Sequence, residues 1–410
     1  MYNYRSFLLE YRCINPSLSY GHPVNGFLAS ARGTSMEVLM DKKYIFGIFI
    51  ALIVLAGISV ILLNQGGSSN SGDSQKVNTS NPTKQSVNTS TSGLKTVRHG
   101  YLPSNGDALI FIAKEEGFWT EEGLNVELYQ FTKGTEGYNS LFGNKLDTVG
   151  AGTSDPATYI AQGADITIIG GLMSEGQFLV TAPENSKALA DLNNWKGKKI
   201  ATITMSNGDL IYKSALKKAG IDWKNDVTFL ELGSPNAVLE AVKTGKADGG
   251  IIWIPYEILA QQQGLSVASY SYQYYDNHPC CRIALKTETL NEDRATYVKF
   301  EKGLIRAYKF FSENENKSVD DIQKYVKVDR EAIRQSTWSN YFYASPDPNT
   351  NGVKEYYQMM KDSGYINTDV KIEDHIDSTV YKEALDELIA ENPDDQFYQK
   401  LLSEYKEMNT

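Results

Sequence analysis

The sequence predicts an α/β protein whose globular part, from about Leu94 onward, folds as two similar lobes. Short apolar segments alternate with helix-type periodicity in this part, which is typical of mainly parallel sheets covered by helices on both faces. A step containing Lys, Asp and Gly occurs twice, at Lys145–Gly150 and at Lys246–Gly250. The chain has 410 residues, of which 41% are hydrophobic, enough for one large core or two smaller ones.

The residues before the globular part predict a tether to a membrane. Residues 1–35 lack clear periodicity and are interpreted as a doubtful N-terminal extension. Residues 36–63 hold an apolar run, Tyr44–Leu63, which as a helix reaches about 30 Å and so can span a bilayer. Lys42 and Lys43 precede the run, so the positive-inside rule places the following chain outside the cell. A retained anchor is favoured over a cleaved signal segment, because no Ala-x-Ala follows. Residues 64–93, rich in Ser, Asn, Thr and Gly, are a flexible linker.

The first globular unit reads as strand, polar loop, helix and strand. An apolar stretch at Thr96–Leu102 predicts a strand, and Pro103–Gly106 predicts a loop. A helix pattern begins at Ala108 and ends at Gly117, and Gly123 precedes a second strand, Leu124–Leu128. Phe118 and Trp119 between them are interpreted as apolar plugs.

The same reasoning assigns the remaining elements. The first lobe continues with Gly137–Phe142 (helix), Thr148–Gly150 (strand), Pro156–Gln162 (helix) and Ile166–Gly170 (strand). The second lobe has a helix after Asn207, then Val227–Glu231 (strand), Ala237–Thr244 (helix) and Gly249–Trp253 (strand). After a return to the first lobe near Arg282–Leu285, amphipathic helices are expected at Asp293–Ser312, Val319–Tyr325, Arg330–Trp338, Val353–Ser363, Val380–Ile389 and Gln396–Tyr405. Residues 94–190 and 282–410 therefore form lobe 1, and residues 191–281 form lobe 2.

Several motifs resemble one protein family. They are HGYLPSNGDALIFIAKEEGFWTEEGLNVEL at His99–Leu128, GNKLDTVGAG at Gly143–Gly152, DLNNWKGKKI at Asp191–Ile200 and WIPYE at Trp253–Glu257. The sequence resembles substrate-binding proteins of ABC importers, in the branch that takes up nitrate, alkanesulfonates, taurine or thiamine pyrimidine precursors. The resemblance implies a two-lobed, periplasmic-binding-protein-like (type II) fold with C-terminal helices, and an ABC permease and ATPase as partners.

Candidate ligand contacts lie in polar loops that follow predicted strands and open helices. Ligands of open α/β sheets collect at the carboxyl ends of strands, where helix N-termini offer free N–H groups. Capping alone would also explain these polar residues, but in the family such loops line the cleft. The candidates are Ser104, Asn105 and Asp107 in the first loop, Thr153, Ser154 and Asp155 in the second, and Ser206, Asn207 and Asp209 in the second lobe.

Further candidates lie where the chain nears and recrosses the hinge. Trp253 and Tyr256 can supply flat apolar walls with polar handles. His278 and Arg282 could bind an anion such as sulfonate, nitrate or carboxylate. The acidic side chains of the candidate loops favour a cationic or hydrogen-bonding ligand instead, so the charge of the pocket stays open.

The adjacent thiols of Cys280 and Cys281 admit three interpretations. They are buried structural thiols, or a disulfide between neighbours, or, together with His278, ligands of a soft metal or an iron species. The spacing of a closed zinc site is absent from the sequence, so no metal ligand is assigned firmly.

These observations predict a membrane-anchored, extracytoplasmic solute-binding protein rather than an enzyme. A net charge of -10 without a basic run argues against a nucleic-acid partner. No phosphate-binding loop, nucleophile elbow or zinc-protease motif occurs in the sequence, and no cofactor is expected. The expected ligand is a nitrate-, sulfonate- or taurine-like anion or a pyrimidine precursor. The alternative is an enzyme of the pyrimidine-precursor-synthase class, which would need a reactive Lys or His in the same cleft.

Overall fold

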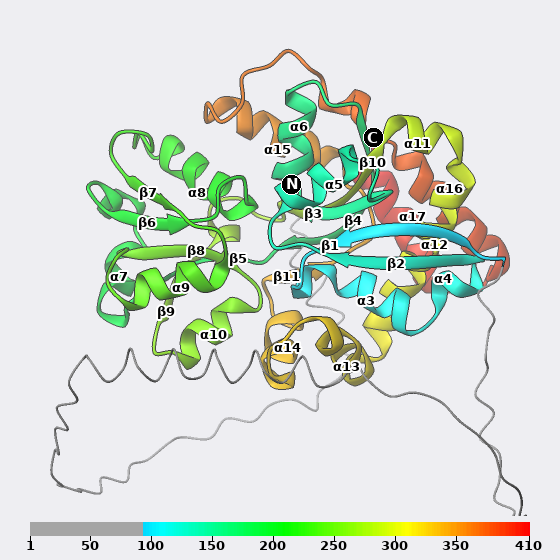
Figure 1. Ribbon diagram of the computed structural model, residues 1–410, viewed down its shortest axis with the longest axis horizontal. Coiled ribbons are helices and arrows are strands. Elements are labelled where there is room, and N and C mark those ends of the chain that lie inside the picture. Colours follow the sequence, from blue (N-terminus) through cyan, green and yellow to red (C-terminus); the bar gives the residue numbers. More distant parts are fainter. Residues whose placement is uncertain (1–92) are drawn as a thin grey trace, which may run out of the picture. The chain divides into compact units, whose positions relative to one another are not determined.

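The structure, a computed structural model, describes residues 93–410. The predicted N-terminal extension and membrane span, and nearly all of the predicted linker, lie outside these residues. Within residues 93–410, no helix is both long enough and apolar enough to cross a membrane. Ser90–Thr410 make up one compact unit with two sheets (Figure 1).

The first sheet has the order β11-β4-β10-β3-β1-β2. Its strands are β1 (Lys95–Tyr101), β2 (Leu124–Gln130), β3 (Thr148–Gly152), β4 (Ile166–Glu175), β10 (Pro279–Lys286) and β11 (Phe342–Ala344). Strand β1 pairs in parallel with β2 and β3, and His99 faces Leu128 on one side and Thr148 on the other. The late strand β10 runs antiparallel between β3 and β4.

The second sheet has the order β7-β6-β8-β5-β9. Its strands are β5 (Gln177–Thr181), β6 (Lys199–Thr202), β7 (Thr228–Glu231), β8 (Gly249–Trp253) and β9 (Ser266–Tyr270). Strand β6 pairs in parallel with β7 and β8, and β5 lies antiparallel between β8 and β9. In each sheet most strands therefore run in one direction, and the α/β fold class predicted from the sequence is confirmed.

The chain crosses between the sheets at two adjacent points. Only Gly176 separates β4 from β5, and the return passes through Asn277 and His278 into β10. The two crossings are joined, because the Asn277 N–H donates to Glu175 Oε1 at 2.9 Å and the Glu175 N–H donates to the His278 carbonyl at 3.0 Å. Both crossing points lie earlier in the chain than the lobe boundaries expected at residues 190 and 281, and we propose them as the hinge.

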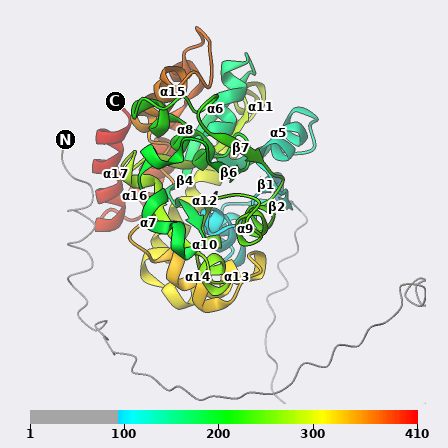
Figure 2. The same cartoon turned by 90° about the vertical axis from the view of Figure 1, so that its left-hand side faces the viewer.

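Helices cover both sheets (Figures 1 and 2). In and beside the first lobe they are α3 (Ala108–Glu115), α4 (Phe118–Glu121), α5 (Gly134–Phe142), α6 (Ser154–Ala161), α11 (Thr287–Glu292), α12 (Arg294–Glu313), α13 (Glu315–Tyr325), α14 (Arg330–Thr337), α15 (Thr350–Asp362), α16 (Ser378–Glu391) and α17 (Gln396–Met408). In the second lobe they are α7 (Ser186–Leu189), α8 (Asn207–Lys218), α9 (Pro235–Lys243) and α10 (Tyr256–Gln262).

The predicted apolar plug at Phe118–Trp119 is confirmed for Trp119, which holds the first unit against the C-terminal helices. The Trp119 side chain is buried, stacks on Phe300 of α12 with ring centroids 4.9 Å apart, and donates from Nε1 to the Phe300 carbonyl at 2.8 Å. Gly303 makes room for the indole, since a Cβ there would lie 2.2 Å from the Trp119 ring. A single small residue in α12 thus permits this packing.

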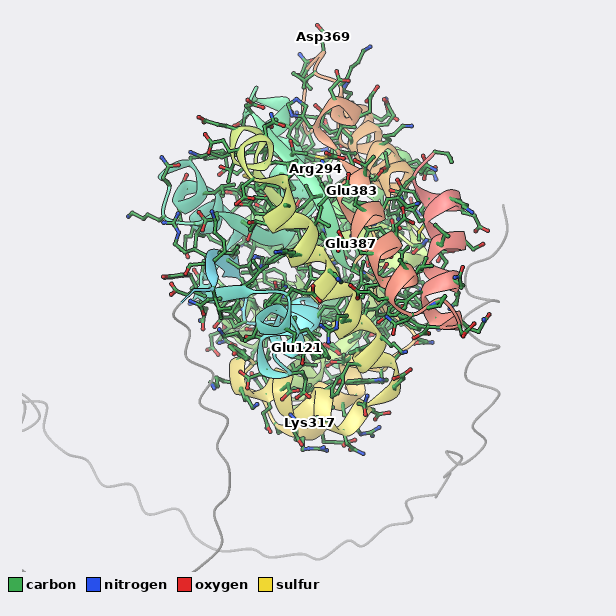
Figure 3. All side chains as sticks on the ribbon, turned by 90° about the vertical axis from the view of Figure 1, so that its right-hand side faces the viewer. Glu121, Arg294, Lys317, Asp369, Glu383 and Glu387 are labelled. Carbon is green, nitrogen blue, oxygen red and sulfur yellow. The ribbon has the colours of Figure 1, made fainter. Side chains whose placement is uncertain are left out.

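Ion pairs join α12 to its neighbours at the outer surface of the first lobe. Figure 3 shows Arg294 of α12 beside Glu383 of α16, and their side chains pair at 3.1 Å. Eight residues further along α12, Lys302 pairs with Glu387 of α16 at 3.4 Å. Such partly exposed pairs contribute little individually, about 0–1 kcal/mol, so the buried faces of the helices dominate the packing.

Candidate functional site

A cavity lies between the two lobes, beside the hinge. It encloses about 620 Å³, counting the part that is open to solvent. The first lobe contributes Leu102, Ser104, Gly106, Lys133, Gly134, Thr135, Gly152, Asp155 and Met173. The second lobe contributes Gln177, Ile203, Thr204, Ser206, Asn207, Trp253 and Ile254, the crossing between β4 and β5 contributes Gly176, and the start of β10 contributes Cys280 and Cys281. The mostly apolar lining with a few polar groups is typical of a site for a small molecule.

Three helices begin at the cavity, each soon after a strand of a sheet. Helix α5 follows β2 and starts at Gly134, α6 follows β3 and starts at Ser154, and α8 follows β6 and starts at Asn207. Ser206 caps α8, because its Oγ accepts from the Asp209 N–H at 3.2 Å. The carboxyl ends of strands from both sheets therefore present helix N-termini to one space.

Asn207 joins the two lobes at the edge of the cavity. Its Nδ2 donates to the Cys280 carbonyl at 2.6 Å. Its Oδ1 accepts from the Ser154 N–H at 2.9 Å and from the Tyr356 hydroxyl at 3.0 Å. The Ser154 hydroxyl donates in turn to the Met205 carbonyl. One side chain of the second lobe is thus bonded to α6 and α15 of the first lobe and to the returning strand β10.

Asp155 is a buried carboxyl that faces the cavity. It is 6% exposed, and no hydrogen bond or ion pair reaches its carboxyl from residues 93–410. Burial raises the pKa of Asp155 to about 8. The carboxyl packs against Gly134, where a Cβ would lie 2.1 Å from Asp155 Oδ2. Glycine at this position is therefore necessary for the observed position of the carboxyl.

Cys280 and Cys281 both reach the cavity because β10 is irregular there. Alternation would send neighbouring side chains to opposite faces of the sheet, but the pairing of β10 with β4 shifts register on both sides of Cys281. Both are free thiols with Sγ atoms 3.4 Å apart. Burial raises the pKa of Cys280, but hydrogen bonds from Cys281 and Gln177 outweigh it and lower that pKa below its usual value. The hydrogen bond to Cys280 raises the pKa of Cys281.

Comparison with known proteins places the chain in a family. The NMT1-like family matches residues 90–320, which is more than half of the chain. The chain belongs to the NMT1-like family. A Brucella abortus protein, named only as a binding protein, is 29% identical over 242 residues, or 57% of this chain and 72% of its own length. The Bacillus subtilis binding protein YtlA is 25% identical over 253 residues, or 59% of this chain and 74% of its own length.

Solved structures show the same fold for this NMT1-like chain. The periplasmic nitrate-binding protein NrtA of Synechocystis PCC 6803 aligns with a TM-score of 0.63 at 18% identity, covering 72% of this chain and 89% of that one. The periplasmic aliphatic sulphonate-binding protein SsuA of Escherichia coli aligns with a TM-score of 0.59 at 17% identity, covering 70% and 99%. The resemblance predicted from the sequence, to binding proteins of the nitrate and sulfonate type, is confirmed.

Several predicted ligand residues of the NMT1-like chain line the cavity, and several do not. Ser104, Asp155, Ser206, Asn207 and Trp253 line it, as do Cys280 and Cys281. Tyr256 packs behind Trp253, with ring centroids 6.4 Å apart. The remaining predicted contacts hold the surrounding structure together and do not line the cavity; they are Asn105, Asp107, Thr153, Ser154, Asp209, His278 and Arg282.

In the first lobe these supporting side chains connect the loops to the body of the fold. Asn105 Nδ2 donates to the hydroxyls of Ser336 at 2.9 Å and Thr337 at 2.6 Å, which ties the first loop to α14. The Thr153 hydroxyl donates to the Cys280 carbonyl at 2.9 Å. Asp107 is fully buried behind the loop, and burial raises its pKa well above the usual value.

In the second lobe Asp209 serves a buried ion pair. Its carboxylate lies 2.8 Å from Lys213 Nζ, one turn further along α8, and it also accepts from the Thr202 hydroxyl at 3.0 Å. The rings of Trp223 and Phe229 lie 4.9 and 4.7 Å from the same ammonium. Asp209 also accepts from the Tyr365 hydroxyl of the first lobe at 3.4 Å, so its carboxylate is engaged by protein groups of both lobes.

The two predicted anion-binding residues are engaged by other groups of the protein, Arg282 by backbone carbonyls and His278 by a side-chain hydroxyl. Arg282 is buried, and its Nη1 donates to the carbonyls of Met173 at 3.1 Å and Cys281 at 2.8 Å. The His278 Nε2 lies 2.9 Å from the Ser271 hydroxyl, and burial lowers the pKa of His278 to about 3. Within residues 93–410, no group of three or more His, Cys, Asp and Glu side chains could hold a metal ion. The candidate set of His278, Cys280 and Cys281 therefore does not converge on a metal position.

Sequence reasoning did not single out other lining residues. Lys133, Gly134 and Thr135 lie at the start of α5 after an ordinary polar turn, and Gln177 and Met173 lie in apolar strands. Gln177 Nε2 donates to Cys280 Sγ at 2.8 Å. The sequence gives no sign of this contact, because the two residues are 103 positions apart. The only sequence signal was the strand–loop–helix order before α5, which is the pattern that marked the other loops.

Proposed function

We propose that this protein is the extracytoplasmic solute-binding component of an ABC importer and that it captures a small polar organic ligand between its lobes. The observation that carries the proposal is the cavity, which is lined by both lobes, by Gly176 at one crossing, and by Cys280 and Cys281 just after the other. A ligand that contacts both lobes favours the closed arrangement, because it binds that arrangement more tightly than the open one. Delivery to a permease and an ATPase follows, and the predicted N-terminal span would keep the protein near them.

Of the two predicted ligand classes, the lining favours a flat organic molecule such as a pyrimidine precursor over a nitrate-, sulfonate- or taurine-like anion. Arg282 and His278, the candidates for binding an anion, are engaged instead by the Met173 carbonyl and the Ser271 hydroxyl, respectively. The one cationic side chain in the described lining, Lys133, is exposed. Trp253 supplies a flat wall, and Met173 and Ile254 supply apolar contacts.

The proposal is tested by ligand screening on the full-length chain purified in detergent. Native mass spectrometry would show whether a small organic molecule co-purifies. A panel of nitrate, alkanesulfonates, taurine, amines, alcohols and pyrimidines would then be titrated while tryptophan fluorescence is recorded. We expect at least one organic member to bind with a fluorescence change that Trp253→Phe removes. Absence of both a co-purified molecule and any binding from the panel contradicts the proposal.

The enzyme alternative makes a different prediction in the same screen. It requires a reactive Lys or His in the cleft. In the described part of the chain, the cavity is lined by Lys133 but by no His, and Lys133 is exposed to solvent. We therefore expect bound ligand to be recovered unchanged after prolonged incubation, as monitored by mass spectrometry. Conversion of the ligand that Lys133→Ala abolishes would favour the enzyme.

A further inference from the structure

The polar side chains that line the cavity differ in whether other groups of the protein form hydrogen bonds with them. Asn207 has hydrogen bonds through both atoms of its amide. Gln177 donates to Cys280 Sγ and accepts from the Ser271 hydroxyl at 3.4 Å. Ser104 Oγ accepts from the Gly106 N–H at 3.1 Å. Asp155 is the exception among these, because its carboxyl receives no hydrogen bond from residues 93–410.

No group of the described residues engages the Asp155 carboxyl, yet the carboxyl lies almost buried at the wall of an open cavity, where a bound ligand can reach it. Leaving a buried polar group unpaired costs about 1–3 kcal/mol, and more for a charged group. The position of the carboxyl is well defined, because the carboxyl packs against Gly134 and Asp155 lies in the first turn of α6. A negative charge there is favourably placed with respect to the helix dipole. The missing partner is most simply supplied by the ligand.

The groups around Asp155 define which partner fits. Tyr138 of α5, Tyr159 of α6, and Tyr356 and Tyr365 from α15 and the segment after it are the titratable groups near enough for the Asp155 charge to affect their pKa. All four are neutral phenols near pH 7, since burial raises the pKa of each. Lys133 also lines the cavity but is exposed. No buried cation of the described residues therefore competes for the carboxylate.

We infer that the ligand carries a basic amino group, as an ammonium or protonated amino-heterocycle, which pairs with the carboxylate of Asp155. The inference rests on the proposed function and deepens it by naming the charge of the ligand and the side chain that recognises it. The flat part of the ligand contacts Trp253 in the same cavity. A charged pair formed in a buried cavity discriminates strongly against ligands that lack the donor, because the carboxyl is then left unpaired.

Three matched probes separate ligand charge from ligand shape: benzylamine, benzyl alcohol and benzenesulfonate. Each would be titrated into the full-length chain in detergent by isothermal titration calorimetry. We expect benzylamine to bind at least about tenfold more tightly than the other two. Asp155→Asn should remove that preference by lowering the affinity for benzylamine to about that for benzyl alcohol. The matched control is Asp147→Asn, which removes a carboxylate paired with Arg98 outside the cavity and should leave all three affinities unchanged.

The pH dependence provides a second readout that a structural role of Asp155 would not produce. Because burial raises its pKa to about 8, binding of a cation below that pH must release the proton from Asp155. The affinity for benzylamine should rise about tenfold per pH unit between about pH 6 and about pH 8, where the amine itself stays protonated. In Asp155→Asn the affinity should not depend on pH over this range.

The outcomes distinguish this inference from the proposed function. Equal affinity for benzylamine and benzyl alcohol, or a preference for benzenesulfonate, overturns the inference. It is also overturned if benzylamine fails to bind while any uncharged or anionic member of the wider panel binds, and in that case the proposed function stands. If no member of the panel binds and nothing co-purifies, the proposed function fails, and the inference fails with it.

Discussion

Asn207 offers the sharpest test of how the two lobes are held together. The side chain is 3% exposed and makes hydrogen bonds to α6, α15 and β10. Asn207→Ala removes all of them at once. Two of its partners then differ in what remains to them. The Cys280 carbonyl still accepts from the Thr153 N–H at 2.6 Å and from the Thr153 hydroxyl at 2.9 Å. The Ser154 N–H and the Tyr356 hydroxyl lose their acceptor.

The cost of the substitution follows from these two groups. An orphaned buried donor costs about 1–3 kcal/mol, so two of them cost about 2–6 kcal/mol, and we expect a loss near 3 kcal/mol in the free energy of unfolding. Tyr356→Phe removes one donor but leaves Asn207 Oδ1 bonded to the Ser154 N–H. Its cost should be about 1 kcal/mol. In the double variant no Tyr356 hydroxyl remains to be orphaned, so its cost should be about 1–2 kcal/mol less than the sum of the two single costs.

Urea denaturation of the four proteins, followed by circular dichroism, measures these differences. The slopes of the unfolding curves should agree among the variants, because a changed slope would mean that the folded or unfolded state had changed in exposure. A loss below about 1 kcal/mol for Asn207→Ala, or additivity of the two substitutions within about 0.5 kcal/mol, would refute the reasoning. Either result would mean that Asn207 does not carry the contact between the lobes.

The remaining predictions concern the lining of the cavity. Gly134→Ala should abolish ligand binding and shift the Asp155 carboxyl, since the new Cβ would lie 2.1 Å from its Oδ2, whereas Gly233→Ala, with nothing within 4 Å, should bind normally in the same titration. The raised pKa of Asp155 contributes stability that is fully present below its unfolded value of about 4 and is lost as pH rises through about 8. Asp155→Asn should therefore increase the free energy of unfolding of the ligand-free chain at about pH 8 and change it little at about pH 4. Equal effects at the two pH values would contradict the raised pKa. Cys280, whose pKa is lowered, should react with iodoacetamide before Cys281, and mass spectrometry of tryptic peptides showing the reverse order would contradict the assignment.

Much of the fold was predictable because local patterns and tertiary packing agree. The predicted strand Gly249–Trp253 has the bounds of β8, and the predicted helices Gln396–Tyr405 and Arg330–Trp338 match α17 and α14 to within a few residues. Their periodicity is read correctly because each has one buried face. The strand β5 was missed because Gln177–Thr181 follows β4 with a single glycine between them. The polar break at residues 174–177 is so short that the sequence does not show that the apolar residues after it join another sheet.

The candidate site was predictable where it depends on the ends of strands, and not where it depends on register. Asp155 and Asn207 were found because each lies in the first turn of a helix that follows a strand. Arg282 was assigned to the ligand on its chemistry, but it is bonded to the backbone of Met173 and Cys281 instead. The shifted register of β10 decides which of its side chains reach the cavity, and a shift of this kind has no signature in residue type.

The returning strand explains why the site forms at the hinge rather than at the carboxyl edge of one sheet alone. Strand β10 lies antiparallel between β3 and β4, so its first residues meet the last residues of both neighbours. Gly152 at the end of β3, Gly176 just after β4, and Cys280 near the start of β10 are thereby brought to the same cavity. Any rotation of the second lobe about the crossings must change the relation of these three segments to Asn207 and Trp253. Under the closure we propose, a ligand held there contacts both lobes directly, which is the condition for its binding energy to drive that closure.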